Sequence, residues 1–192
     1  MKPVGIFGGT FDPIHIGHLI TAESVFEQRE LEKIIFIPCF ISPHKTNVKS
    51  IEAIHRIKMV ELAAEGNQFI EVSDYEINKG DVSYTFDTLQ YLKQQYENLE
   101  LIIGYDNLVN FHTWKNPEGI LELTKLLVLK RKSDDDEKKL HNFYDNTIYI
   151  NTPVIEISSS EIRKRIAAGL KIRNLVPPKV DDYINENSLY SR

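Results

Sequence analysis

At 192 residues, with an ordinary apolar fraction of 42%, the chain is long enough for one domain with a hydrophobic core. A formal net charge of −5 argues against general binding to nucleic acid, which needs a basic face. The single cysteine, Cys39, excludes an internal disulfide and a thiolate zinc cluster. No apolar run approaches the roughly 20 residues of a membrane span, and Met1–Val4 lacks the features of a secretory signal, so we expect the cytoplasm.

Short apolar strand patterns alternate with amphipathic helical patterns along the chain. We expect strands at Val4–Gly8, Lys33–Pro38, Phe69–Ser73, Glu100–Gly104, Leu126–Lys130 and Thr147–Asn151. We expect helices near His15–Gln28, Ile51–Glu65, Thr85–Tyr96, Asn107–Trp114, Pro117–Leu123, Ser159–Ala168 and Pro178–Glu186. This alternation predicts an α/β fold with a doubly wound, mostly parallel sheet, in a single domain over residues 1–192 with a helical C-terminal part from about residue 158. Ligands of such sheets bind at the carboxyl ends of the strands.

The first strand-to-helix loop carries the most informative residues, Gly8-Gly9-Thr10-Phe11-Asp12-Pro13 and then His15-Ile16-Gly17-His18. The glycine pair lets the backbone turn sharply and approach a ligand closely. The next helix presents its free N–H groups to the same place, and His15 and His18 share one side of it. The loop therefore predicts a polyphosphate site. Metal binding by the two histidines is the alternative, although no third ligand lies nearby.

A second helix start, after residue 157, combines a cap with an arginine. Ser158 is the expected N-cap, with Glu161 three residues on, which alone indicates only a well-started helix. Arg163 adds a guanidinium to the free N–H groups and predicts a second anion clamp. Lys45 follows the second strand and is a further candidate phosphate ligand, with a plain surface loop as the alternative.

These two segments resemble both hallmarks of the HIGH-type nucleotidyltransferases, a superfamily with a Rossmann-like fold. It includes nicotinate and nicotinamide mononucleotide adenylyltransferases, pantetheine-phosphate adenylyltransferases and cytidylyltransferases. The resemblance implies an ATP site made by Gly8, Gly9, Thr10, Phe11, His15, His18, Ser159, Ile162 and Arg163. Within the active site, it implies that the catalytic residues are His15, His18, Lys45 and Arg163.

Three further segments resemble bacterial nicotinate mononucleotide adenylyltransferases. Residues 83–88 are similar to an S-Y-T-x-D-T helix start, and residues 175–190 match the C-terminal pattern. Residues 104–114 are similar to a G-x-D…W element, whose aspartate binds ribose and whose tryptophan stacks on the pyridine ring. The acceptor-binding residues implied are Tyr84, Thr85, Asp106, Trp114 and Lys115. Taken one at a time, the aromatic residues could be core packing and the aspartate a helix cap.

Lys115 departs from the family pattern, because many members carry tyrosine or histidine directly after the tryptophan. Tyr105 also stands where a small or polar residue is frequent. We hypothesise that the Lys115 ammonium adds attraction to the carboxylate of a nicotinate ring.

The resemblance implies in-line attack of a mononucleotide phosphate on the α-phosphorus of ATP, with release of pyrophosphate. Nicotinate mononucleotide is the expected acceptor and deamido-NAD the product, in NAD biosynthesis. Mg²⁺ is expected on the ATP phosphates and not in a protein metal site. The expected partners are these small molecules, without nucleic acid or membrane, and homo-oligomer formation stays open. The alternatives are nicotinamide mononucleotide as main acceptor, a pantetheine-phosphate adenylyltransferase, and a non-catalytic nucleotide-sensing module.

Overall fold

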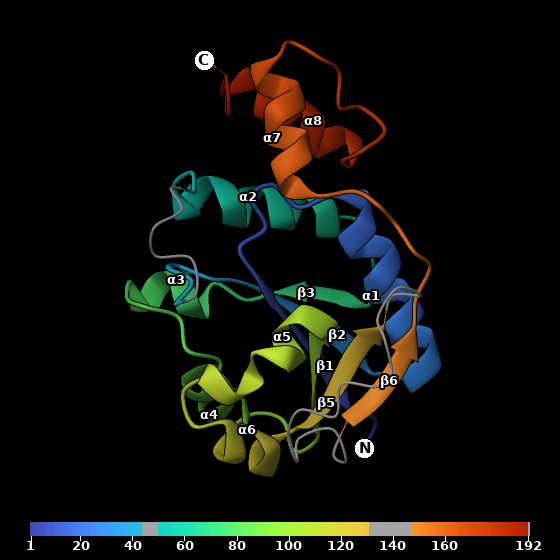
Figure 1. Cartoon of the computed structure of the whole chain (residues 1–192), viewed down its shortest axis with the longest axis vertical. Helices are drawn as coiled ribbons and strands as arrows, with labels where there is room; N and C mark the ends of the chain where they lie inside the picture. The colour runs from blue at the N-terminus through green and yellow to red at the C-terminus, as the bar shows by residue number, and fades with distance from the viewer. Residues whose placement is uncertain (44–49, 131–146, 192) are drawn as a thin grey trace.

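A six-stranded sheet forms the centre of the computed structural model, which describes residues 1–43, 50–130 and 147–191 (Figure 1). Its strands are β1 (Val4–Gly9), β2 (Lys33–Pro38), β3 (Ile70–Val72), β4 (Leu99–Gly104), β5 (Lys125–Lys130) and β6 (Thr147–Asn151). Their order is β3-β2-β1-β4-β5-β6, and every neighbouring pair is parallel. The doubly wound sheet is thus confirmed, and it is wholly parallel where a mostly parallel one was expected.

Strand β2 shows why these segments form the sheet. Its residues 34–37 are all at most 1% exposed, although successive side chains point to opposite faces. A strand covered by helices on both faces is apolar at every position, and this is the continuous run seen in the sequence.

Helices cover both faces of the sheet (Figure 1). One core cluster joins the sheet to α1 (Ile16–Arg29), α2 (Ala53–Ala64), α7 (Ser159–Ala167) and α8 (Pro178–Glu186). The other joins it to α4 (Thr85–Leu92), α5 (Tyr105–Val109), the 3₁₀-helix η1 (Phe111–Thr113) and α6 (Pro117–Leu123). Across the described ranges, no helix combines the length and apolarity that crossing a membrane requires.

Three helix predictions were wrong in detail. The short helix α3 (Tyr75–Lys79) was not expected, and α4 ends at Leu92, before the expected Tyr96. The single helix expected near Asn107–Trp114 is instead α5 followed by η1, with a break at Asn110. The Asn110 side chain donates to the carbonyl of Asp106 at 2.9 Å, and Thr113 Oγ1 donates to the Asn110 carbonyl at 2.7 Å. Such side-chain bonds to the backbone compete with regular helix.

The strand order reverses between β1 and β4, and this position defines where a ligand can enter. The chain runs from β1 outward to β2 and β3, then returns to β4 on the other side of β1. Crossovers from the two strands therefore leave toward opposite faces, and their carboxyl ends open a crevice, as is usual for doubly wound sheets.

Candidate active site

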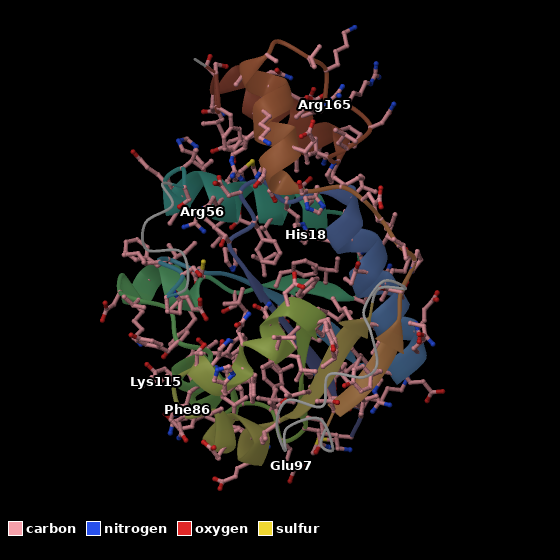
Figure 2. All side chains as sticks on the ribbon, viewed as in Figure 1. His18, Arg56, Phe86, Glu97, Lys115 and Arg165 are labelled. Carbon is pink, nitrogen blue, oxygen red and sulfur yellow. The ribbon has the colours of Figure 1, made fainter. Side chains whose placement is uncertain are left out.

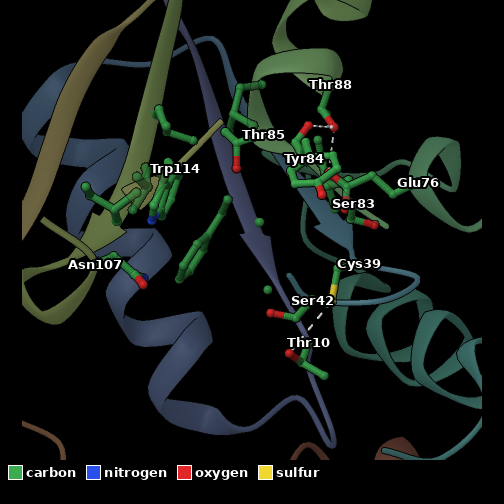
Figure 3. Close-up of a pocket in the computed structure, with 18 of the residues that line it drawn as sticks. Thr10, Cys39, Ser42, Glu76, Ser83, Tyr84, Thr85, Thr88, Asn107 and Trp114 are labelled. Carbon is green, nitrogen blue, oxygen red and sulfur yellow. Dashed lines mark hydrogen bonds between the residues drawn. The ribbon is translucent and has the colours of Figure 1, made fainter. Parts of the chain in front are cut away.

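A cavity of about 220 Å³ lies at the carboxyl ends of β1 and β4. Figure 3 shows Trp114 and Asn107 on one side of it, with Ser83, Tyr84 and Thr85 on the other. This volume is below the range of roughly 300–1,000 Å³ typical for larger ligands. The cavity therefore has room for part of a larger ligand, with the remainder of that ligand lying outside it. The residues that line the cavity from β1 and the loop after it include Gly8, Gly9 and Thr10.

The expected acceptor residues divide into two groups. Tyr84, Thr85 and Trp114 line the cavity, and the Trp114 ring lies 5.3 Å from the fully buried Phe111 ring. Asp106 is exposed in the first turn of α5 and is not among the lining residues. Only the first group therefore forms the wall of the enclosed space.

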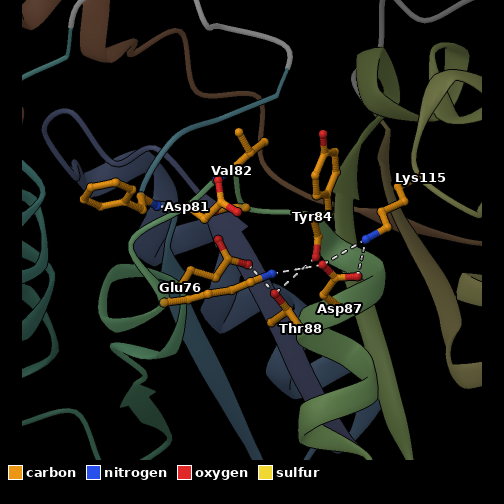
Figure 4. A network of polar contacts seen from close by, with 10 residues as sticks. Glu76, Asp81, Val82, Tyr84, Asp87, Thr88 and Lys115 are labelled. Carbon is orange, nitrogen blue, oxygen red and sulfur yellow. Dashed lines mark hydrogen bonds and ion pairs between the residues drawn. The ribbon is translucent and has the colours of Figure 1, made fainter.

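Lys115 also lies outside the lining, and its ammonium is engaged by a carboxylate. The Nζ atom is 2.8 and 3.0 Å from the two carboxylate oxygens of Asp87, and 4.9 Å from the centroid of the Tyr84 ring (Figure 4). Lys79 reaches the same carboxylate at 2.9 Å. Burial would raise the pKa of Asp87, but the two lysines outweigh it and hold that pKa below its usual value.

Glu76 is a buried anchor behind the Tyr84–Thr85 wall that sequence reasoning missed. It is 7% exposed and lines the cavity, and burial raises the pKa of its carboxyl. Thr88 Oγ1 donates to it at 2.6 Å, and the Ser83 hydroxyl also bonds to it. Ser83 in turn accepts from the N–H of Phe40 at 2.9 Å, so these contacts fix the start of α4 to the loop after β2.

The two histidines of the first loop stack on each other. Their ring centroids are 3.7 Å apart, and the backbone N–H of His15 donates to Nδ1 of His18 at 3.2 Å. Because Nδ1 accepts, a neutral His18 carries its proton on Nε2. A Cβ atom on Gly17 would lie 3.0 Å from Nδ1 of His15, so a side chain at that position would crowd the His15 ring and require it to shift slightly.

His15 itself is buried and neutral. It is 6% exposed, and its Nδ1 atom has no hydrogen-bond partner among the described residues. Burial lowers the pKa of His15 to about 4, so the ring is uncharged at neutral pH. A buried polar nitrogen without a partner is costly, and burial without a partner favours the neutral form of the ring.

Helix α7 is docked directly on the first loop. Arg163 Nη1 donates to the carbonyl of Asp12 at 2.6 Å and lies 3.6 Å from an Asp12 carboxylate oxygen. Ser159 Oγ donates to the Pro13 carbonyl at 2.9 Å, and the Tyr190 hydroxyl donates to Asp12 at 2.8 Å. The two segments expected to form the anion site therefore lie side by side, and Figure 2 shows His18 near the base of α7.

Arg56 is a second structural residue that the sequence did not reveal. It is 1% exposed on α2 and donates to the carbonyls of Thr10 at 2.9 Å, Cys39 at 2.6 Å and Phe40 at 3.0 Å. These bonds tie the loop after β1 to the loop after β2. A basic residue in an amphipathic helix normally faces water, so no pattern marks it in advance.

The remaining predicted site residues occupy different positions. Phe11 is 3% exposed, with its ring centroid 5.1 Å from that of His18. Ile162 is completely buried, and its N–H is used by the Ser158 carbonyl at 3.1 Å, which leaves it a core residue of α7. Lys45 lies outside the described residues. Among those described, no group of three or more histidine, cysteine or acidic side chains could hold a metal ion.

Known proteins resemble this chain over nearly its full length. Residues 6–165 match the cytidylyltransferase-like family model. The probable nicotinate-nucleotide adenylyltransferase of Caldicellulosiruptor bescii is 42% identical over 98% of this chain and 99% of its own. The protein of that name from Clostridium perfringens is 38% identical, with all of both chains covered. Plasmodium falciparum nicotinic acid mononucleotide adenylyltransferase complexed with NaAD superposes with a TM-score of 0.81 at 22% identity, over 99% of this chain and 98% of that one, which shows a shared fold.

Proposed function

Because this chain belongs to the nicotinate-nucleotide adenylyltransferase family, we propose that it transfers the adenylyl group of ATP to nicotinate mononucleotide, giving deamido-NAD and pyrophosphate. One observation carries the proposal. The hydrogen bond from Arg163 to Asp12 joins α7 to the loop that bears His15 and His18, and this loop borders a cavity lined by aromatic side chains. A charge-binding region and a ring-binding region therefore adjoin, as transfer between two nucleotides requires.

The first loop and α7 form the ATP end in this proposal. The backbone of Gly8, Gly9 and Thr10 borders the crevice closely enough to contact the nucleotide. His18 donates from Nε2 to the α-phosphate, and His15 and Arg163 contact the rest of the polyphosphate. Ser159 presents the N-terminal turn of α7 to the same anion.

Three more residues complete the ATP end. Lys45 follows β2 in the chain, whose carboxyl end lies beside that of β1, and we assign it to the phosphates. Phe11 supports the His18 ring from the core side, and Ile162 holds α7 on the core. Mg²⁺ would arrive with ATP, bound by its phosphates, since magnesium often keeps its waters and binds substrate phosphates.

The cavity forms the acceptor end. The Trp114 ring stacks on the pyridine ring, which is electron-poor and cationic in the mononucleotide. On the opposite wall, backbone groups of Tyr84 and Thr85 contact the ring substituent. In this proposal Asp106, which is exposed in the first turn of α5, accepts from the ribose hydroxyls outside the cavity.

The reaction needs alignment and charge stabilisation but no protein nucleophile. A phosphate oxygen of the mononucleotide forms a bond to the α-phosphorus of ATP. The bond from that phosphorus to the bridging oxygen breaks, and pyrophosphate leaves with the electron pair. The protein holds the two substrates in line and places hydrogen-bond donors at the oxygens where negative charge increases.

The direct test supplies ATP with one acceptor at a time: nicotinate mononucleotide, nicotinamide mononucleotide or phosphopantetheine. We expect pyrophosphate and deamido-NAD with the first, slower reaction with the second, and no adduct with the third. Products are separated by chromatography, and a reaction without acceptor controls for ATP hydrolysis. Transfer only to phosphopantetheine would replace the proposal with the rival enzyme. Nucleotide binding without release of pyrophosphate from any acceptor would instead indicate a sensing module.

A further inference from the structure

Two walls of the cavity come from different parts of the chain. Trp114 stands between η1 and α6, whereas Tyr84 and Thr85 begin α4 on the other side (Figure 3). The α4 wall is fixed from behind by the buried Glu76. The width of the cavity therefore depends on what holds the Trp114 segment against α4.

Helix α6 lies directly on α4 at a glycine. A Cβ atom on Gly119 would lie 2.6 Å from the Phe86 ring, so only a residue without a side chain permits this approach. Asn116 caps α6 by accepting from the Gly119 N–H at 3.2 Å. The residue before this cap, Lys115, is thereby brought to the surface of α4, and Figure 2 shows it near Phe86.

Lys115 connects the two walls of the cavity at the place where α6 lies on α4. It directly follows Trp114, and its Nζ atom bonds both oxygens of Asp87, which stands in the first turn of α4 after Tyr84 and Thr85 (Figure 4). The same Nζ atom lies over the Tyr84 ring. The Asp87 side chain is 22% exposed and that of Lys115 is 47% exposed, so the ion pair lies at the surface with its carboxylate partly shielded from solvent.

We propose that the Lys115–Asp87 ion pair is a clasp that fixes the width of the acceptor pocket. Lys115 then acts as a positioning residue for the pyridine mononucleotide and not as a direct ligand of its carboxylate. The inference rests on the proposed function for the identity of the acceptor. Its physical basis is that the Lys115 ammonium already bonds both oxygens of Asp87, so direct binding of a substrate carboxylate would have to compete with that contact.

Replacing Asp87 distinguishes a clasp from direct attraction between Lys115 and the carboxylate of the acceptor. If Lys115 attracted the nicotinate carboxylate directly, Asp87→Asn would release its ammonium and tighten binding of the acid over the amide. If the pair is a clasp, Asp87→Asn and Lys115→Gln loosen the same contact and weaken both acceptors alike. Their effects are then not additive in the double variant, because both remove one interaction.

The experiment uses Trp114, the only tryptophan in the chain, as a binding probe that does not depend on turnover. Quenching of its fluorescence gives the Kd of nicotinate and nicotinamide mononucleotides for wild type, Lys115→Gln, Asp87→Asn and the double variant. We expect each single variant to raise both Kd values about 2- to 5-fold, as for a partly exposed ion pair. The double variant should be no weaker than the singles, and the KM for ATP should stay at the wild-type value.

Lys79→Gln is the matched control. Lys79 pairs with the same Asp87 carboxylate, but it does so from α3, and among the described residues it forms no ion pair with the Trp114 segment. This variant should bind both acceptors as wild type does. The proposal is overturned if either single variant keeps the wild-type Kd, if Asp87→Asn tightens binding, or if the two losses add. Wild-type protein that binds the acceptors without turning them over would contradict the proposed function and leave the clasp to be judged by these Kd values.

Discussion

The proposed phosphate end and the proposed acceptor end of the site are held in place by different contacts. At the phosphate end, hydrogen bonds from Arg163, Ser159 and Tyr190 fix the backbone and side chain of the first loop. At the acceptor end, an enclosed cavity has aromatic side chains in its walls and a partly exposed ion pair outside it. Groups that oppose developing charge must be placed before reaction starts. Recognition of a ring depends more on the packing of the walls on either side of it.

The largest expected effect tests the phosphate end. Replacing His18 with alanine removes the Nε2–H donor, and we expect turnover to fall on the order of 100-fold or more. The KM for the mononucleotide should change little, since His18 does not line the cavity. Steady-state kinetics measures both constants, and thermal unfolding checks that the fold is intact. Near-normal turnover in a folded variant would remove His18 from the proposed mechanism.

The buried His15 predicts a loss of stability in acid. Its pKa is about 4 in the folded protein and about 6.5 in the unfolded chain. Between these values the unfolded chain binds the proton more readily. The free energy of unfolding is therefore unaffected by this group above pH of about 6.5 and falls, by about 3 kcal/mol, as pH drops toward 4.

Urea denaturation at several pH values measures how the free energy of unfolding falls with pH, with His15→Asn as the comparison variant. The variant has no imidazole to titrate and should show a shallower decline between pH of about 6.5 and about 4. Parallel declines in the two proteins would mean that His15 is not held in its neutral form by the fold.

Trp114 tests the acceptor end. Replacing it with alanine removes the stacking surface, and we expect the KM for both pyridine mononucleotides to rise roughly 10-fold. The KM for ATP should hold, because in the proposed mechanism the Trp114 ring stacks on the pyridine ring of the acceptor and not on ATP. Trp114→Phe keeps a flat ring and should retain most of the affinity. Equal changes in the constants of ATP and mononucleotide would show that the two ends are not separable.

Tyr190 should give the smallest effect. Burial and the nearby Asp12 carboxylate raise the pKa of Tyr190, so the phenol stays protonated and donates to Asp12. Tyr190→Phe should lower the free energy of unfolding by about 1 kcal/mol. It should also raise the KM for ATP a few-fold, since the first loop loses one of its fixing bonds, while the acceptor KM remains at its wild-type value. A change confined to the acceptor KM would contradict the division between the two ends.

The strands could be predicted almost to the residue, because burial on both faces requires a continuous apolar run such as residues 34–37. Helix α3 could not be predicted, because its five residues are too few to show a helical period of apolar side chains. The break at Asn110 depends on side-chain bonds to the backbone that the apolar pattern does not encode.

Within the site, residues that belong to local sequence motifs could be predicted, whereas residues placed by tertiary contacts could not. The positions of His15, His18 and Trp114 follow from strings that are contiguous in the chain, although their roles stay predictions. Arg56 and Glu76 could not be predicted, because charged residues are rarely buried and only the folded contacts explain them. The pairing of Lys115 with a residue 28 positions away is equally invisible in a local pattern.

The separation of Asp12 from Arg163 in the chain has a consequence for the order of folding. Their bond spans 151 positions, and that from Tyr190 to Asp12 spans 178, whereas Thr88 to Glu76 spans only 12. Short loops close at lower entropic cost and earlier than long ones. The contact behind the α4 wall is therefore expected to form before the contact between α7 and the first loop.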